Sequence, residues 1–212
     1  MSKADQIALP LDWPQGGDER RFIQSDANRA AVEQFARPAM WPVRATILVG
    51  PRRSGRSLLA RNAVARMDGR LFDDAERHDE EELFHAWNAA QDSKKPLVLV
   101  SDHAPPEWSP RLADLRTRLA VTPVVRIELP DDALFVALVE LLFADRGLHL
   151  SGEALRFLAS RVTRDYWTAE RVVDTIDRFA ISTGARLSMP TVRRALMEAG
   201  LIERTHQGEL YG

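Results

Sequence analysis

The feature that most constrains the fold is a short apolar segment that runs directly into a glycine-rich loop and then into a helix. Residues 45–49 are apolar, partly β-branched and followed by glycine, which predicts a buried parallel strand. Residues 50–57 follow with the spacing G-x-x-x-x-G-R-S, and residues 58–67 have helical character. In such a unit, glycines let backbone N–H groups turn inward around a phosphate at the positive end of the helix. The sequence therefore predicts an α/β fold organised around a phosphate-binding loop (P-loop).

The remaining pattern divides the chain into three parts. Further strands are predicted at 97–100 and 124–129, and these alternate with predicted helices at 28–37, 80–91 and 111–119. After Pro130 the pattern changes to four amphipathic helices without a strand, at 131–145, 151–162, 166–182 and 190–199. We therefore expect a flexible N-terminal segment (1–20), an α/β core with a parallel sheet (21–130) and a helical domain (131–212).

Composition excludes several classes of protein. The 212 residues include no cysteine, which excludes disulfides and thiolate metal sites, and no apolar run approaches the length of a membrane span. The five histidines lack metal-ligand spacing. Net charge is −2 and neither half is basic, which argues against a dedicated DNA-binding domain. We expect a cytoplasmic protein without a membrane partner.

The P-loop departs from the usual pattern at one position. Arg56 stands where lysine normally reaches the β and γ phosphates, and a planar guanidinium is not equivalent to an ammonium. Ser57 could hold Mg²⁺, and Asp73-Asp74 could supply the acidic pair that completes the site. The alternatives are a former P-loop kept as a tight strand–helix turn, and an ordinary polar turn at the aspartates. We expect the chain to have no ATPase activity of its own.

Read in chain order, these segments resemble the AAA+ part of the bacterial replication-initiator family, which includes the initiator DnaA and its smaller relative Hda. The resemblance runs from about residue 5 to 202 and rests on the order and spacing of several motifs. These motifs are Phe22-Ile23, residues 25–30, Trp41-Pro42, residues 50–57, Phe72-Asp73-Asp74, residues 81–88, residues 99–106, residues 114–119, residues 130–132, residues 143–148, residues 176–178 and residues 187–190.

The resemblance implies an AAA+ parallel sheet with a C-terminal helical lid and a site for ADP or ATP with Mg²⁺. Almost no residues separate the P-loop helix from Asp73, so we expect the family's edge strand to be missing and about four strands to remain. Trp167 aligns with the sensor 2 arginine, and Arg171 lies one turn on. The implied nucleotide contacts are Phe22, Ile23, Gly50, Ser54, Gly55, Arg56, Ser57, Leu58, Asp73, Asp74, Asp102 and Arg171, with Ser57 and Asp73 as Mg²⁺ ligands.

Two further elements of the resemblance imply a regulator. Residues 114–119 (Asp-Leu-Arg-Thr-Arg-Leu) are similar to the family box whose last arginine is the arginine finger, which places the finger at Arg118. Its neighbour Arg116 is an alternative, and a solvated or salt-bridged arginine is the interpretation without the family. The N-terminal hexapeptide resembles the clamp-binding motif of Hda, in which glutamine and apolar side chains anchor an extended peptide. Its anchoring residues are Gln6, Ile7, Leu9, Pro10 and Leu11.

Together these motifs imply a protein that is tethered to the DNA polymerase sliding clamp at the replisome and presents Arg118 to ATP bound on DnaA. Hydrolysis would convert DnaA to its ADP form and prevent re-initiation. The sequence ends where DnaA would continue into its helix-turn-helix domain, so sequence-specific DNA binding is not expected. Two alternatives stay open, an independent P-loop ATPase or loader and a nucleotide-free clamp adaptor. Self-association through the finger surface is a further open question.

Overall fold

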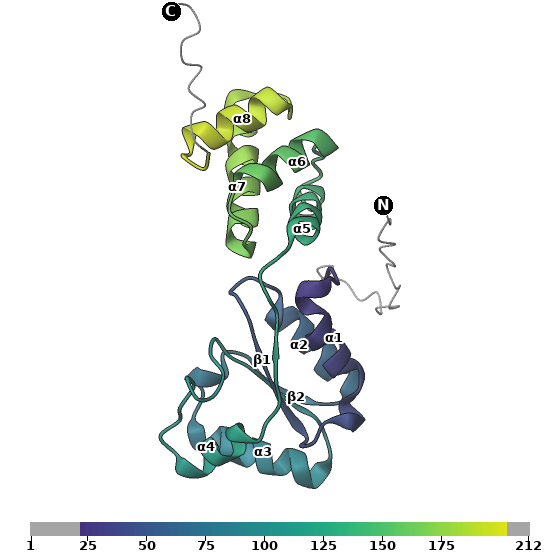
Figure 1. Ribbon diagram of the computed structural model, residues 1–212, viewed down its shortest axis with the longest axis vertical. Helices are drawn as coiled ribbons and strands as arrows, with labels where there is room; N and C mark the ends of the chain where they lie inside the picture. The colour runs from purple at the N-terminus through teal and green to yellow at the C-terminus, as the bar shows by residue number, and fades with distance from the viewer. Residues whose placement is uncertain (1–21, 203–212) are drawn as a thin grey trace, which may run out of the picture. The chain divides into compact units, whose positions relative to one another are not determined.

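The computed structural model describes residues 22–202, which divide into two compact units (Figure 1). Among the described residues, the first unit contains residues 22–50 and 55–128, and the second contains residues 51–54 and 129–202. The elements of the first unit are η1 (Asp26–Asn28), α1 (Arg29–Ala36), η2 (Pro38–Met40), β1 (Ala45–Val49), α2 (Arg56–Met67), β2 (Arg70–Phe72), η3 (Ala75–Arg77), α3 (Glu80–Ser93), β3 (Leu97–Val100), α4 (Ala113–Ala120) and β4 (Val124–Arg126).

The four strands form one parallel sheet in the order β2-β3-β1-β4. The prediction of an α/β sheet of about four strands without the family's edge strand is confirmed. Only Asp68 and Gly69 separate α2 from β2, so the chain has no room for another strand there. A Cβ at position 69 would lie 2.6 Å from the Pro96 carbonyl oxygen, and glycine is therefore required at this close approach.

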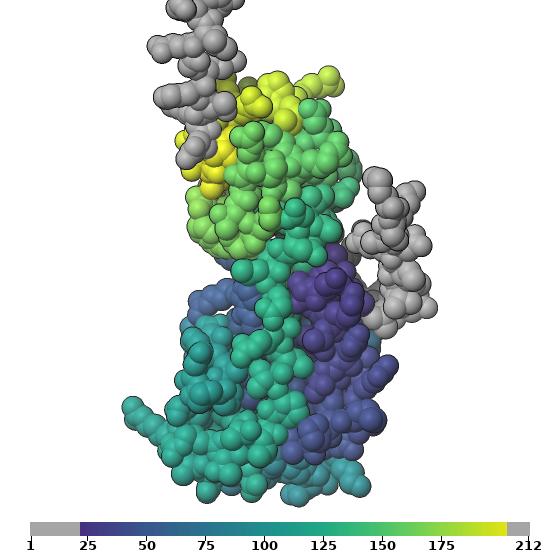
Figure 2. Space-filling model, in the orientation of Figure 1, coloured from purple at the N-terminus to yellow at the C-terminus, as the bar shows by residue number. Residues whose placement is uncertain are grey.

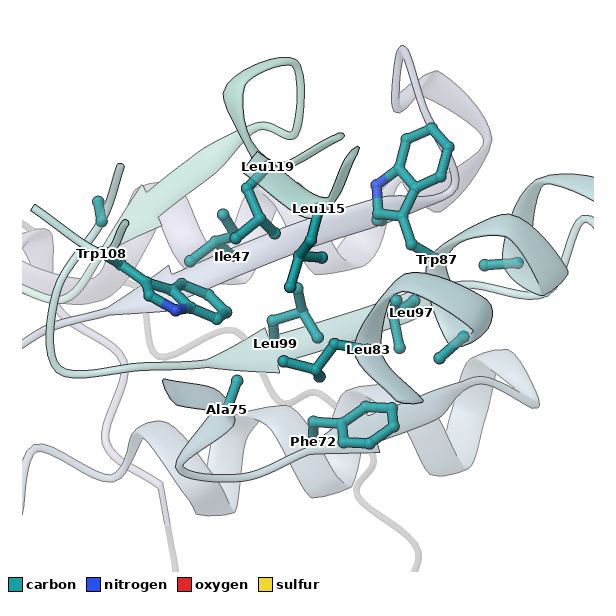
Figure 3. Close-up of a cluster of buried hydrophobic side chains, with 14 of the residues drawn as sticks. Ile47, Phe72, Ala75, Leu83, Trp87, Leu97, Leu99, Trp108, Leu115 and Leu119 are labelled. Atoms are coloured by element: carbon teal, nitrogen blue, oxygen red, sulfur yellow. The ribbon is translucent and has the colours of Figure 1, made fainter. Parts of the chain in front are cut away.

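Helices cover both faces of the sheet, as the apolar character of its central strands demands. Alternate residues of β1 and β3 point to opposite faces. Ile47 and Leu99 belong to the core cluster shared with α3 and α4, to which Leu83 and Leu115 contribute (Figure 3). On the other face, the sheet packs against α1 and α2. This burial on both faces explains why the two central strands read as continuous apolar runs.

The fourth strand is shorter than the sequence pattern predicted. The prediction extended it to residue 129, but β4 ends at Arg126. The Ile127 amide still donates to the Val49 carbonyl, whereas the Glu128 amide donates to the Ala27 carbonyl beyond the sheet. The backbone therefore leaves the sheet after one more bond.

The second unit is helical, with α5 (Asp132–Ala144), α6 (Gly152–Arg161), α7 (Tyr166–Thr183) and α8 (Met189–Glu198). Each helix begins after a residue whose side chain accepts a hydrogen bond from a backbone amide of the first turn, which defines its start. These caps are Asp131, Ser151, Asp165 and Ser188. The helices enclose an apolar core of their own that includes Phe135, Phe143 and Leu158. Residues 132–202 are coloured from teal-green to yellow in Figure 2.

No helix among residues 22–202 combines the length and apolar character needed to cross a membrane.

Candidate functional site

The P-loop connects β1 to α2 and contains two residues with left-handed backbone conformation. Arg53 and Gly55 have φ of 67° and 84°, in the left-handed region. Left-handed residues also occur in the concave backbone turns that bind anions. Glycine adopts this conformation freely at position 55, whereas at Arg53 it costs about 1–2 kcal/mol. The ring of Phe22 packs against Gly55, because a Cβ there would lie 3.1 Å from Cε2 of that ring. Phe22, which was predicted as a nucleotide contact, thus lies against the P-loop glycine.

Arg56, at the position of the usual lysine, turns away from the loop and toward the end of β3. Its Nη1 donates to the Ser101 carbonyl oxygen at 2.5 Å, and its Nη2 donates to Asp102 Oδ1 at 2.8 Å. Residue 56 is only 8% exposed, so this ion pair is largely shielded from water. The positive charge expected to face a phosphate is therefore already neutralised by a carboxylate of the chain.

The predicted Mg²⁺ ligands also contact each other. The Ser57 hydroxyl donates to Asp73 Oδ1 at 2.8 Å, and Arg61 approaches the other Asp73 oxygen at 3.7 Å. Asp74 is exposed, has a φ of 51° and starts the short helix η3. Among the described residues, no group of three or more His, Cys, Asp or Glu side chains could hold a metal ion alone. A magnesium ion here would have to bring most of its ligands as water or phosphate.

This arrangement does not fit a nucleoside triphosphate as an intact P-loop would. The backbone of the loop is suitable, but the side chains at positions 56 and 57 are hydrogen-bonded to Asp102 and Asp73. Phosphate binding through Arg56 would require breaking a shielded ion pair, which is costly because it leaves a carboxylate behind.

Arg118 lies in the last turn of α4. Its guanidinium lies over the indole of Trp87, 4.9 Å from the ring centroid. Trp87 Nε1 donates to Thr122 Oγ1, and that hydroxyl in turn donates to the Arg118 carbonyl oxygen. Trp87 is 6% exposed and lies near the start of β3 at Leu97 (Figure 3). The buried Trp87 thus contacts the Arg118 guanidinium directly and is linked to the Arg118 carbonyl through the Thr122 hydroxyl.

The start of α4 is fixed by a carboxylate from α3. Both Glu80 oxygens accept backbone amides, one from Arg111 at 2.9 Å and the other from Leu112 at 2.7 Å. These two hydrogen bonds lower the pKa of Glu80 from its ordinary value of 4.5. Arg116 donates to the backbone oxygens of Pro110 and Arg111, so its guanidinium is directed at its own loop. Of the two candidate fingers, Arg118 is the one whose guanidinium is not held by backbone carbonyls in this way.

The structure brings together part of the predicted nucleotide set. Phe22, Gly55, Arg56, Ser57, Asp73 and Asp102 lie around the loop and its helix. The Ile23 carbonyl accepts from Asn28 and thereby ties the preceding segment to η1. Arg171 belongs to the second unit, where its guanidinium lies over the ring of Trp167 at 4.3 Å. The predicted clamp-binding residues 6–11 lie outside the described residues.

Trp87, Thr122 and Glu80 were not singled out by the sequence. Trp87 was visible as an apolar position on a predicted helix and as part of the motif at residues 81–88, and Thr122 and Glu80 gave no signal. Their roles depend on contacts 31 to 35 residues away along the chain. Only the packing of α3 against α4 reveals them.

Comparisons with known protein sequences found one matching family model and several relatives. The family model described as "Hda, lid domain" matches residues 132–196. An uncharacterised protein of Haemophilus influenzae is 31% identical over 122 residues, which cover 56% of this chain and 53% of that protein. DnaA of Magnetococcus marinus is 28% identical over 135 residues, covering 64% of this chain and 30% of DnaA. The chain thus spans about half of the first relative and about a third of the DnaA sequence.

Comparisons with solved structures give the same fold. Domain III of the Thermotoga maritima replication initiation protein DnaA superposes with a TM-score of 0.69 at 18% identity, covering 86% of this chain and 95% of that chain. AMPPCP-bound DnaA from Aquifex aeolicus gives a TM-score of 0.64 at 16% identity, covering 84% and 68%. At these identities the likeness establishes the AAA+ fold and no more.

Proposed function

The chain is an Hda/DnaA-like AAA+ protein of the replication-initiator family, and we propose that it stimulates ATP hydrolysis by DnaA while tethered to the sliding clamp. Arg118 acts as an arginine finger supplied to the ATP on DnaA. An arginine supplied in trans stabilises the charge that develops on the transferring phosphoryl group, commonly accelerating hydrolysis by ~10³ or more. DnaA is thereby converted to its ADP form, and re-initiation of replication is prevented.

The observation that carries this proposal is the support given to Arg118. A catalytic arginine must be held in place before its partner arrives, because ordering it during the reaction costs side-chain entropy. The buried indole of Trp87 and the hydroxyl of Thr122 provide that support.

Topology also favours action in trans. The chain enters α4 after the carboxyl end of β3 and leaves it just before the start of β4, so Arg118, in the last turn, lies toward the amino-terminal edge. The P-loop follows the carboxyl end of β1, at the other edge of the parallel sheet. Arg118 is thus poorly placed to serve the P-loop of its own chain, and a partner's nucleotide is the better candidate.

The proposal is tested by measuring hydrolysis of ATP bound to DnaA in the presence of DNA-loaded clamp and this protein. Arg118→Ala is expected to lower the stimulation by about 10³-fold, the effect of losing an arginine finger, while clamp binding stays unchanged. Arg116→Ala is the matched variant on the same helix and is expected to retain most of the stimulation. Full stimulation by Arg118→Ala, or a greater loss with Arg116→Ala, would remove the assigned role.

The tether requires a separate measurement. Binding of the full chain to the clamp is compared with binding of a variant that carries Gln6→Ala, Leu9→Ala and Leu11→Ala. We expect the three substitutions to abolish binding, because they remove the polar anchor and both leucines of the peptide. Equal binding by the variant would exclude the hexapeptide as the tether.

A nucleotide-free clamp adaptor is the second candidate, favoured by the ion pair between Arg56 and Asp102. It differs from the first candidate only if Arg118 has no effect on DnaA, so the Arg118→Ala assay separates the two. An independent ATPase is disfavoured by the same ion pair.

A further inference from the structure

The first unit contains a carboxylate, Asp102, that binds the arginine standing at the position of the usual P-loop lysine. Arg56 follows Gly55 directly and is the first residue of α2, the helix end that attracts anions. The Arg56 side chain extends to Ser101 and Asp102 at the end of β3. The ion pair therefore crosses from the P-loop to the neighbouring strand.

The length and shape of arginine make this bridge possible. A guanidinium presents several donors in a fixed plane, and here two of its nitrogens bind two different acceptors. Residue 56 is 8% exposed, and the Asp102 side chain is 25% exposed. A charge this shielded needs a partner at all times, because an unpaired buried charge is strongly unfavourable.

The other polar group of the loop is satisfied in the same manner. Ser57 donates to Asp73, which Arg61 also approaches. The residues of an intact P-loop that would bind phosphate and magnesium are thus bound to carboxylates of the chain, which leaves no side chain at positions 56 and 57 waiting for a ligand.

We propose that the Asp102 carboxylate takes the place of nucleotide phosphates as the anionic partner of Arg56, so that this chain keeps its P-loop folded and acts without bound ATP or ADP. The protein would then have no nucleotide-controlled states of its own. Its availability to a partner would depend on its amount and on its tether alone.

The test is binding of fluorescent (mant) ADP and ATP, with Mg²⁺, to the full chain alone. The wild type is expected to show no saturable binding up to about 1 mM nucleotide. Asp102→Asn removes the competing charge while keeping the side-chain shape, and it is expected to bind at least about tenfold more tightly than the wild type. Asp92→Asn is the control, because Asp92 is an exposed carboxylate of α3 and the charge change is the same.

Thermal unfolding provides a second measurement on the same proteins. Saturating Mg·ADP is expected to leave the wild-type midpoint unchanged and to raise that of Asp102→Asn, because a ligand stabilises only the state that binds it. Micromolar binding of ADP by the wild type would overturn the inference. So would an Asp102→Asn variant that folds and binds no better than the wild type. Neither measurement involves DnaA or the clamp, so failure here leaves the proposed stimulation of DnaA untouched.

Discussion

The ion pair between Arg56 and Asp102 should contribute measurably to the stability of the first unit. Removing one partner of a fully buried pair costs about 3–5 kcal/mol, whereas an exposed pair is worth about 0–1 kcal/mol. Here one side chain is 9% exposed and the other 25%, and Arg56 would keep its bond to the Ser101 carbonyl. We therefore expect Asp102→Ala to lower the free energy of unfolding by about 2–3 kcal/mol, between these two limits.

A double-mutant cycle isolates the pair. Arg56→Met, Asp102→Ala and the combined variant are compared by denaturant unfolding followed by tryptophan fluorescence. Among the described residues, Trp41, Trp87 and Trp108 lie in the first unit and report on it. The coupling energy is expected to be about 1.5–2.5 kcal/mol, within the range for two residues that contact each other in a shielded ion pair.

An exposed ion pair provides the matched control. Lys95 and Asp68 approach more closely, at 2.6 Å, but their side chains are 61% and 85% exposed. Lys95→Met should therefore change stability by less than about 0.5 kcal/mol. A coupling energy below about 0.5 kcal/mol for Arg56 and Asp102 would refute the reasoning that burial gives this pair its strength.

Three further predictions concern the support of α4. Leu115 is fully buried beneath the helix, so Leu115→Ala should lower the free energy of unfolding by about 3 kcal/mol. Leu129 is exposed, so Leu129→Ala should lower it by less than about 0.5 kcal/mol. Equal losses in denaturant unfolding would contradict the packing. Trp87→Phe removes the N–H group that donates to Thr122. Expressed as free energies, the loss of DnaA stimulation should exceed the loss of stability, and paired ATPase and unfolding measurements would test this. Because the folded-state pKa of Glu80 is lowered, its stabilising contribution is present above its ordinary value of 4.5 and is lost as pH falls through the lower folded value. The wild type should therefore lose more stability than Glu80→Gln in that acidic range, and parallel acid-unfolding curves would contradict this.

Sequence alone determined the fold class, because its signals are local. An apolar strand that ends at Gly50 and runs through a glycine loop into a helix specifies its own backbone, and helices with capping residues such as Asp131 and Ser188 specify their own starts. The loss of an edge strand was also predictable, because the short connection between α2 and β2 is a matter of chain length. The candidate finger at Arg118 came from the resemblance, since an arginine on an arginine-rich helix carries no local signal of its role.

Tertiary structure decided which partner each charged side chain meets. Arg56 and Asp102 are separated by 46 residues, and only the parallel pairing of β1 with β3 brings the P-loop beside the end of β3. Trp87 and Thr122 are likewise joined by the packing of α3 against α4. Hydrogen bonds and ion pairs act over about 3 Å, a distance that residue spacing along the chain does not encode. The sequence could therefore locate the phosphate loop, but only the fold could show that the loop's arginine, Arg56, pairs with the Asp102 carboxylate of the same chain.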